Sequence, residues 1–84
     1  MSYEVAITKR AEKKLSKISP QYNQKIRQAI NNLSLNPRPV GCISLKGREG
    51  YRIRVGVYRI IYTVSDQKLT ILVIDVGHRQ DVYR

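Results

Sequence analysis

The sequence predicts an α+β domain in which two helices cover one face of a four-stranded sheet. Apolar residues recur every three or four positions across residues 8–35, which is typical of helices with one buried face. Apolar and polar residues then alternate across much of residues 51–76, which is typical of strands. A chain of 84 residues has room for one hydrophobic core, so we expect a single domain spanning residues 1–84.

The first part of the chain predicts a strand followed by a helical hairpin. Residues 3–7 alternate between apolar and other side chains, as in a short strand with one buried face. Thr8 supplies a capping hydroxyl for a first helix, and Ser19-Pro20 repeats this start signal for a second. Residues 36–39, Asn-Pro-Arg-Pro, stop the second helix. The apolar sides of such a helix pair need a sheet to cover.

The second part predicts an antiparallel meander of three strands, which forms one sheet with the N-terminal strand. Residues 51–55 and 58–64 are separated by Gly56-Val57, the spacing of a two-residue hairpin turn with glycine first. This turn would place Arg54 opposite Arg59. A second turn around Asp66-Gln67 leads to the last strand.

This register divides the side chains of the meander between two faces. On the face covered by the helices we expect Tyr51, Ile53, Val55, Tyr58, Ile60, Tyr62, Val64, Leu69, Ile71 and Val73. On the open face we expect Arg52, Arg54, Arg59, Ile61, Thr70, Leu72, Ile74 and Val76. Because Ile61, Leu72 and Ile74 would be exposed apolar groups, the open face also predicts a protein partner.

The charge of the chain indicates a polyanionic partner. Sixteen Lys and Arg residues against six Asp and Glu residues give a net charge of +10, which favours nucleic acid. Part of this excess belongs to the solvent sides of the helices, at Lys9, Lys13, Lys14, Lys17, Lys25 and Arg27.

The remaining basic residues gather around the predicted hairpin. Arginines 52, 54 and 59 share its open face beside Lys46 and Arg48. Like charges paired across strands are destabilising unless an anion neutralises them, and arginine suits bidentate phosphate contact. We therefore expect a phosphate site, although arginines on the solvent side of a half-buried sheet would give the same pattern.

Composition excludes several other classes. No run approaches the roughly 20 apolar residues of a membrane span, and the N-terminus lacks the features of a secretory signal, so we expect a cytoplasmic protein. Cys42 and His78 are the only cysteine and histidine, too few for a structural zinc site. We expect no metal and no cofactor.

The segment Leu45–Tyr62 (LKGREGYRIRVGVYRIIY), with Val76-Gly77-His78-Arg79 and the ending Asp81-Val82-Tyr83-Arg84, resembles the RelE branch of the RelE/ParE superfamily. The order of strand, helix pair and strands agrees over essentially the whole chain. The resemblance implies a toxin that enters the ribosomal A site, cleaves the messenger RNA (mRNA) codon there and so inhibits translation. It also implies a cognate antitoxin, whose complex with the toxin binds operator DNA.

The resemblance also implies roles for individual residues. Cleavage would proceed by attack of the ribose 2′-oxygen on the adjoining phosphate, which makes the protein a metal-independent endoribonuclease. By position, Arg59 matches the arginine that stabilises the phosphate, Arg79 the arginine near the leaving oxygen, and Tyr83 the tyrosine that stacks on the nucleotide. Arg52 and Arg54 occupy positions where well-studied members carry lysines, and arginine stays protonated. We therefore expect them to bind phosphate rather than remove protons.

The exchange of lysine for arginine makes His78 the candidate for proton transfer. Its unperturbed pKa of about 6.5 allows proton exchange near neutral pH. Because successive strand residues point to opposite faces, His78 and Arg79 can reach one phosphate only if the chain turns at Gly77.

Other interpretations remain open. Arg79 could be a solvent-facing strand end, Tyr83 a tail that packs on the sheet, and His78 an exposed loop residue. The whole protein could instead inhibit DNA gyrase in the manner of ParE, without nuclease activity, or be a non-catalytic nucleic-acid-binding module.

Overall fold

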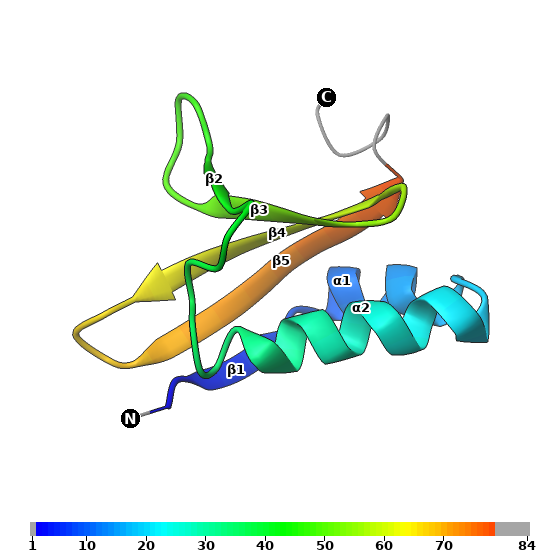
Figure 1. Ribbon diagram of the computed structural model, residues 1–84, viewed down its shortest axis with the longest axis horizontal. Helices are drawn as coiled ribbons and strands as arrows, with labels where there is room; N and C mark the ends of the chain where they lie inside the picture. The colour runs from blue at the N-terminus through cyan, green and yellow to red at the C-terminus, as the bar shows by residue number, and fades with distance from the viewer. Residues whose placement is uncertain (1, 79–84) are drawn as a thin grey trace.

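The computed structural model describes residues 2–78 and contains a helical layer packed on one face of a five-stranded sheet (Figure 1). The helices are α1 (Lys9–Ser16) and α2 (Pro20–Asn32). The strands are β1 (Glu4–Ile7), β2 (Ile43–Ser44), β3 (Tyr51–Val55), β4 (Tyr58–Ser65) and β5 (Thr70–His78), arranged in the order β1-β5-β4-β3-β2. The predicted α+β class is confirmed.

The predicted count of four strands is wrong, because β2 forms a fifth strand at the edge of the sheet. Ile43 pairs with Arg52 and Ser44 with Tyr51, both antiparallel. A strand of two residues is too short to show alternation, which explains why the sequence pattern does not reveal it.

Local capping explains where the helices begin. The Thr8 hydroxyl accepts a hydrogen bond from the Ala11 amide at 3.2 Å and donates one to the Ile74 carbonyl at 2.9 Å. Thr8 thus starts α1 and ties it to β5, which lies beside β1 as a parallel neighbour. Helix α2 begins at Pro20, as predicted, although the Ser19 side chain makes no capping hydrogen bond.

A polar network joins the two helices. The Asn23 side-chain amide donates to the Leu15 carbonyl at 2.6 Å, and Arg27 donates to the Asn23 side-chain oxygen at 2.8 Å. Arg27 also forms an ion pair with Glu12 on α1. These contacts satisfy a carbonyl at the end of α1 and fix the angle between the helices.

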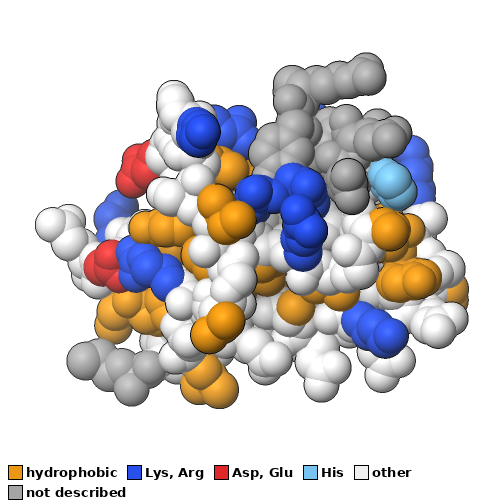
Figure 2. Space-filling model, turned by 45° about the horizontal axis from the view of Figure 1, so that its top comes forward, with side chains coloured by type: hydrophobic (Ala, Val, Ile, Leu, Met, Phe, Trp, Pro, Cys, Tyr) orange, Lys and Arg blue, Asp and Glu red, His pale blue; other side chains and the backbone are white. Residues whose placement is uncertain are grey.

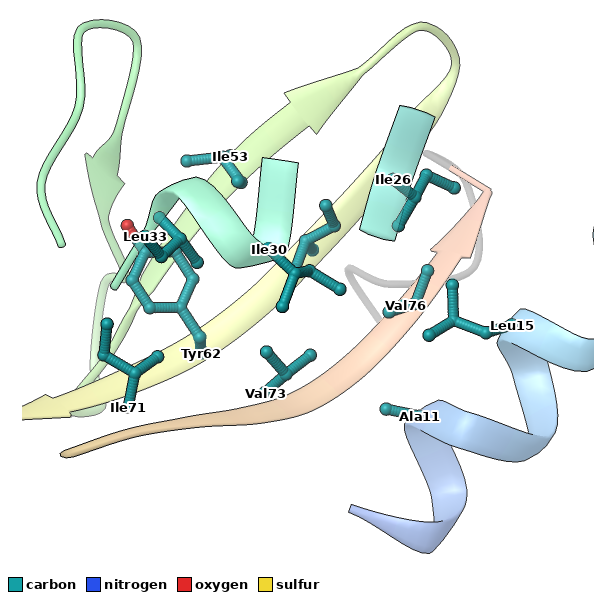
Figure 3. Close-up of a cluster of buried hydrophobic side chains, with 11 residues drawn as sticks. Ala11, Leu15, Ile26, Ile30, Leu33, Ile53, Tyr62, Ile71, Val73 and Val76 are labelled. Atoms are coloured by element: carbon teal, nitrogen blue, oxygen red, sulfur yellow. The ribbon is translucent and has the colours of Figure 1, made fainter. Parts of the chain in front are cut away.

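The core lies between the helices and the sheet (Figure 3). Its side chains come from both helices and from the three central strands, and each is at least nine-tenths buried. They are Ala11, Leu15, Ile26, Ile30, Leu33, Ile53, Ile60, Tyr62, Ile71, Val73 and Val76. Val5 and Ile7 of β1 pack against this cluster from the edge.

The predicted β3–β4 hairpin register is confirmed. Val55 pairs with Tyr58 and Arg54 with Arg59 across the Gly56-Val57 turn. Gly56 has a φ of +60°, the conformation that glycine supplies at the first position of a type II′ turn.

A β-bulge changes the predicted faces of β5. Ile61 pairs with Asp75 but the next residue, Tyr62, pairs with Val73, so Ile74 is an extra residue in β5. One inserted residue reverses the alternation of everything after it. Val76 is therefore fully buried in the core, and its predicted place on the open face is wrong.

The second turn is longer than the sequence predicts. Strand β4 ends at Ser65 and β5 begins at Thr70, so Leu69 lies in the turn rather than in the strand. Leu69 has a φ of 52°, an uncommon conformation for a branched side chain.

A tyrosine–arginine–aspartate cluster joins this turn to the rest of the molecule. Arg38 forms two hydrogen bonds to the Asp66 carboxylate, at 2.9 and 3.2 Å, and one to the Tyr51 hydroxyl at 3.0 Å. The Tyr3 hydroxyl donates to Asp66 at 2.7 Å. The hydrogen bonds from Arg38 and Tyr3 hold the pKa of the Asp66 carboxyl below its usual range.

Buried Tyr62 anchors the connection between α2 and β2. Its hydroxyl donates to the Pro37 carbonyl at 2.7 Å and lies 3.3 Å from Cys42 Sγ in a second hydrogen bond. Burial, together with the contact to Cys42, raises the pKa of this hydroxyl above its ordinary value, so Tyr62 stays neutral and acts as a structural anchor.

Candidate nucleic-acid interface

The sheet face opposite the helices carries three arginines and is called here the arginine face. Arg54 on β3 and Arg59 on β4 lie directly across from each other, and Arg52 lies two residues before Arg54 on the same face. Arg54 is exposed and Arg52 half-buried, whereas Arg59 is only 8% exposed. The predicted convergence of three arginines on one face is confirmed.

A small hollow lies at the turn end of this arginine pair. It has a volume of about 60 Å³ and is lined by Arg54, Gly56, Val57, Tyr58 and Arg59. The hollow is therefore large enough to hold at least one water molecule. The positive charge of the two arginines that line it favours an anion there.

The loop from residue 45 to residue 50 adds further positive charge. Lys46 and Arg48 are exposed in this loop, which rises from the sheet on the side away from the helices (Figure 1). Figure 2 shows Lys and Arg side chains gathered on this side of the molecule. The loop that carries Lys46 and Arg48 thus lies on the same side of the sheet as the arginine face.

Gly50 fixes the base of this loop. Its carbonyl accepts a hydrogen bond from the Leu45 amide at 3.0 Å, and its φ is +136°. A Cβ at this position would lie 3.0 Å from Leu45 Cδ1 and 3.1 Å from the Tyr62 carbonyl oxygen. Only glycine fits this close approach to β4 without strain.

The structure separates His78 from the arginine face. In the β4–β5 register Arg59 lies opposite Gly77, while His78 lies opposite Tyr58, which packs against the helix-side core. The His78 and Tyr58 rings meet edge to face, with centroids 6.2 Å apart. Strand β5 runs through Gly77 to His78, so the turn at Gly77 that would let His78 and Arg79 reach one phosphate is not seen in the described residues.

The remaining proposed catalytic residues, Arg79 and Tyr83, lie outside the described residues. Their roles stay predictions based on the family resemblance.

The apolar residues predicted on the open face differ in exposure. Leu72 is 41% exposed, as predicted, and Ile74 is partly buried at the bulge. Ile61 is only 1% exposed, so its prediction as an exposed contact is wrong. It lies on the central strand between Arg52 and Asp75, and the stems of long side chains readily cover a shorter apolar neighbour.

Sequence reasoning missed two residues of this region. Ile43, which is 48% exposed, lies opposite Arg52 and adds an apolar group beside the arginines. Its place could not be predicted because the sequence pattern does not reveal strand β2. Asp75 lies opposite Ile61 and pairs with Lys14 of α1 at 2.8 Å. The sequence signal that could have identified Asp75 is that it is a single acidic residue within an apolar strand.

Within residues 2–78, no three His, Cys, Asp or Glu side chains form a group that could hold a metal ion. Neither helix of that part of the chain is long and apolar enough to cross a membrane.

Comparison with known proteins identifies the family. A family model described as the ParE toxin of the type II toxin–antitoxin system parDE matches residues 5–83. Toxin RelG of Mycobacterium tuberculosis is 33% identical over 86 residues, covering 100% of this chain and 99% of the relative. The putative toxin RelE1 of Methanocaldococcus jannaschii is 30% identical over 88 residues, covering 100% and 98%.

Solved structures agree with this result. The archaeal RelE–RelB complex from Pyrococcus horikoshii matches with a TM-score of 0.85 at 28% identity, covering 96% of this chain and 99% of the matched chain. The isolated E. coli RelE toxin matches with a TM-score of 0.80 at 28% identity, covering 98% and 92%. The chain therefore belongs to the RelE/ParE superfamily of type II toxin–antitoxin toxins, on its RelE branch, as its sequence predicts.

Proposed function

We propose that this toxin is an endoribonuclease that cleaves mRNA in the ribosomal A site, within the cytoplasm, and thereby inhibits translation. The observation that supports this best is the arginine face, where Arg54 and Arg59 lie across from each other with Arg52 beside them. Attack of a ribose 2′-oxygen on the next phosphate passes through a crowded state of high negative charge. Fixed positive charges stabilise that state more than they stabilise the ground state.

Burial gives Arg59 a role different from that of its neighbours. An arginine that is 8% exposed is held in place and acts through a medium of lower dielectric than water, which strengthens its attraction for a phosphate. Exposed Arg54, half-buried Arg52 and the loop residues Lys46 and Arg48 bind the RNA backbone in this proposal. Arginine cannot serve as a base, because its pKa lies above about 12.

Two further residues complete the proposed chemistry. Arg79 acts near the leaving oxygen and Tyr83 stacks on the nucleotide, as the family resemblance implies. His78 can transfer a proton to the same phosphate only if the end of β5 turns away from Tyr58. The proposal requires no metal and no cofactor.

We also propose a cognate antitoxin that covers Leu72 and Ile74 on the arginine face and reaches Ile61 if the side chains above it move. Relatives from M. tuberculosis, P. horikoshii and M. jannaschii have been solved in toxin–antitoxin complexes, which supports such a partner. Operator DNA is proposed as a ligand of that complex only.

A translation extract programmed with a defined mRNA tests the proposal. Mapping the 5′ ends of the fragments should show cuts within codons that occupy the A site, and none when ribosomes are omitted. Inhibition of DNA supercoiling without RNA cleavage would instead support a gyrase inhibitor. Salt-sensitive RNA binding with neither effect would support a non-catalytic binding module.

A further inference from the structure

Helix α1 carries a second basic surface, separate from the arginine face. Lys9, Lys13 and Lys17 recur every four residues and are all exposed. On the other side of the same helix, Ala11 and Leu15 are fully buried in the core. The three lysines therefore form one line along the solvent side of α1, called here the outer lysine row.

The other two basic residues of α1, Arg10 and Lys14, form ion pairs with Asp75. The outer lysine row has no acidic partner among residues 2–78. Asp75 lies 2.8 Å from Lys14 Nζ and 3.6 Å from Arg10 Nη2, and its side chain is mostly buried. Glu12, the one acid on α1, pairs with Arg27 of α2. Asp75 thus pairs with Lys14 and Arg10, and Glu12 pairs with Arg27, so neither acid forms an ion pair with the outer lysine row.

This arrangement disfavours the helix that carries it. Residues 9–17 contain five basic residues and one acid, a net charge of +4 (five minus one) on a helix of eight residues and its cap. Lysine and arginine occupy its first two positions, where the helix dipole favours negative charge. Like charges four residues apart also repel each other. An anion outside the protein would offset both effects.

The position of α1 excludes a shared ligand with the arginine face. The helices lie on one side of the sheet (Figure 1). The register of β3 and β4 places the arginines on the other side, away from the core. A phosphate group at Arg54 and Arg59 cannot also contact the row. A protein that reaches mRNA inside the ribosomal A site, however, is surrounded by ribosomal RNA, whose phosphates lie on more than one side of it.

We propose that the outer lysine row binds backbone phosphates of ribosomal RNA and holds the toxin in the A site while the arginine face engages mRNA. This inference rests on the proposed function and assigns a separate surface to ribosome binding. Lysine suits it, because a flexible point charge needs no defined phosphate geometry.

The test measures binding to ribosomes programmed with an mRNA that carries a 2′-deoxynucleotide at the A-site position to be cut. This substitution removes the attacking oxygen, so binding is read without cleavage. Affinity is measured between 50 and 200 mM salt for the wild type and for the double variant Lys9→Gln/Lys13→Gln. Losing two phosphate contacts should lower the slope of log affinity against log salt by about 1.5.

The control variant Lys25→Gln/Lys68→Gln removes the same charge from α2 and the β4–β5 turn and should keep the wild-type slope. Thermal unfolding should show that the row variant is at least as stable as the wild type, since substitution relieves repulsion. An equal change of slope in both variants, or an unchanged slope in the row variant, would overturn the inference. The inference would also be overturned if the Lys9→Gln/Lys13→Gln variant bound the antitoxin more weakly but bound ribosomes as the wild type does. A wild type that neither binds nor cuts on ribosomes would instead refute the proposed function.

Discussion

Arg59 combines burial with a position opposite another arginine, and the two properties have separate consequences. Replacing it by alanine should lower the cleavage rate on programmed ribosomes by about 10²- to 10³-fold, because a fixed charge is lost from the transition state. Loss of a buried side chain should also lower stability, so thermal unfolding must be measured on the same sample.

Arg59→Met is the better-matched variant, because it keeps most of the buried volume while removing the charge. Its cleavage rate should fall as far as that of the alanine variant, with a smaller loss of stability. A methionine variant that retains full activity would show that Arg59 serves packing rather than catalysis.

His78 provides a separate test of proton transfer. Because its ring contacts Tyr58 on the side of the sheet away from Arg59, His78→Gln should change the single-turnover rate by less than about threefold and leave its pH profile unaltered. A loss of about 10²-fold, with a flattened profile between pH 6 and 7, would show that the end of β5 turns on the ribosome and brings the ring to the phosphate.

Asp66 predicts how stability changes in acid. Its pKa is lowered in the folded state by hydrogen bonds from Arg38 and Tyr3, so its stabilising effect is present above the unfolded-state pKa of about 4 and is lost as pH falls through the folded-state pKa. Asp66→Asn should therefore be less stable than the wild type at pH 7. The difference should shrink in urea titrations carried out at successively lower pH.

The control for this prediction is Glu49→Gln, an exposed change in the 45–50 loop at a residue with no ion pair among residues 2–78. Its stability relative to the wild type should be nearly independent of pH. If Asp66→Asn behaves in the same way, the cluster around Arg38 makes no contribution in solution.

At the scale of elements, the hairpin was predictable and the edges of the sheet were not. Gly56-Val57 has the spacing and the glycine that one turn type requires, which fixes the register of Arg54 and Arg59. Strand β2 is stabilised by its pairing with β3 and has no pattern of its own. The bulge at Ile74 depends on tertiary contacts of β5 with β4 and α1, which no local signal shows.

In the candidate site, too, the features set by the hairpin could be predicted, and those set by neighbouring strands could not. The arginines converge because they follow the hairpin alternation, which the sequence displays. Burial of Ile61 and the position of His78 depend on neighbouring strands and on the bulge, so both differ from the expectation drawn from β5 alone.

The 45–50 loop offers a test of how an element positions charge. Gly50→Ala should destabilise the protein by about 1 to 3 kcal/mol, because the added Cβ meets the Tyr62 carbonyl at 3.1 Å and the φ of +136° is strained for alanine. It should also weaken RNA binding by displacing Lys46 and Arg48.

Gly47→Ala is the matched control, since a Cβ there has no atom within 4 Å, although its φ of +75° carries a conformational cost. Its loss of stability in denaturant titrations should be the smaller of the two. Equal losses would show that the close contact with β4 is unimportant.

At the scale of the whole molecule, the antitoxin should act as a stabilising ligand of the arginine face. At a free concentration of about 100 times the Kd, it should stabilise the fold by about 2.7 kcal/mol, seen as a higher Tm. Leu72→Asp should reduce this gain, because Leu72 is the most exposed of the three proposed contacts.

Leu35→Asp introduces the same charge at an exposed leucine of the α2–β2 connection, outside the arginine face, and should leave the gain intact. If both variants respond alike to the antitoxin, the proposed footprint is wrong.

The pairing of β1 with β5 also determines when the fold can form during synthesis. Glu4 lies beside Thr70, 66 positions later in the chain, and α1 packs on β5 through a threonine that hydrogen-bonds the Ile74 carbonyl. Strand β1 and helix α1 therefore cannot make their contacts with β5 until β5 has left the ribosome. Contacts so distant in sequence form late and slowly. A nascent chain that lacks β5 has no complete sheet, so toxicity arises in one late step rather than growing as the chain lengthens.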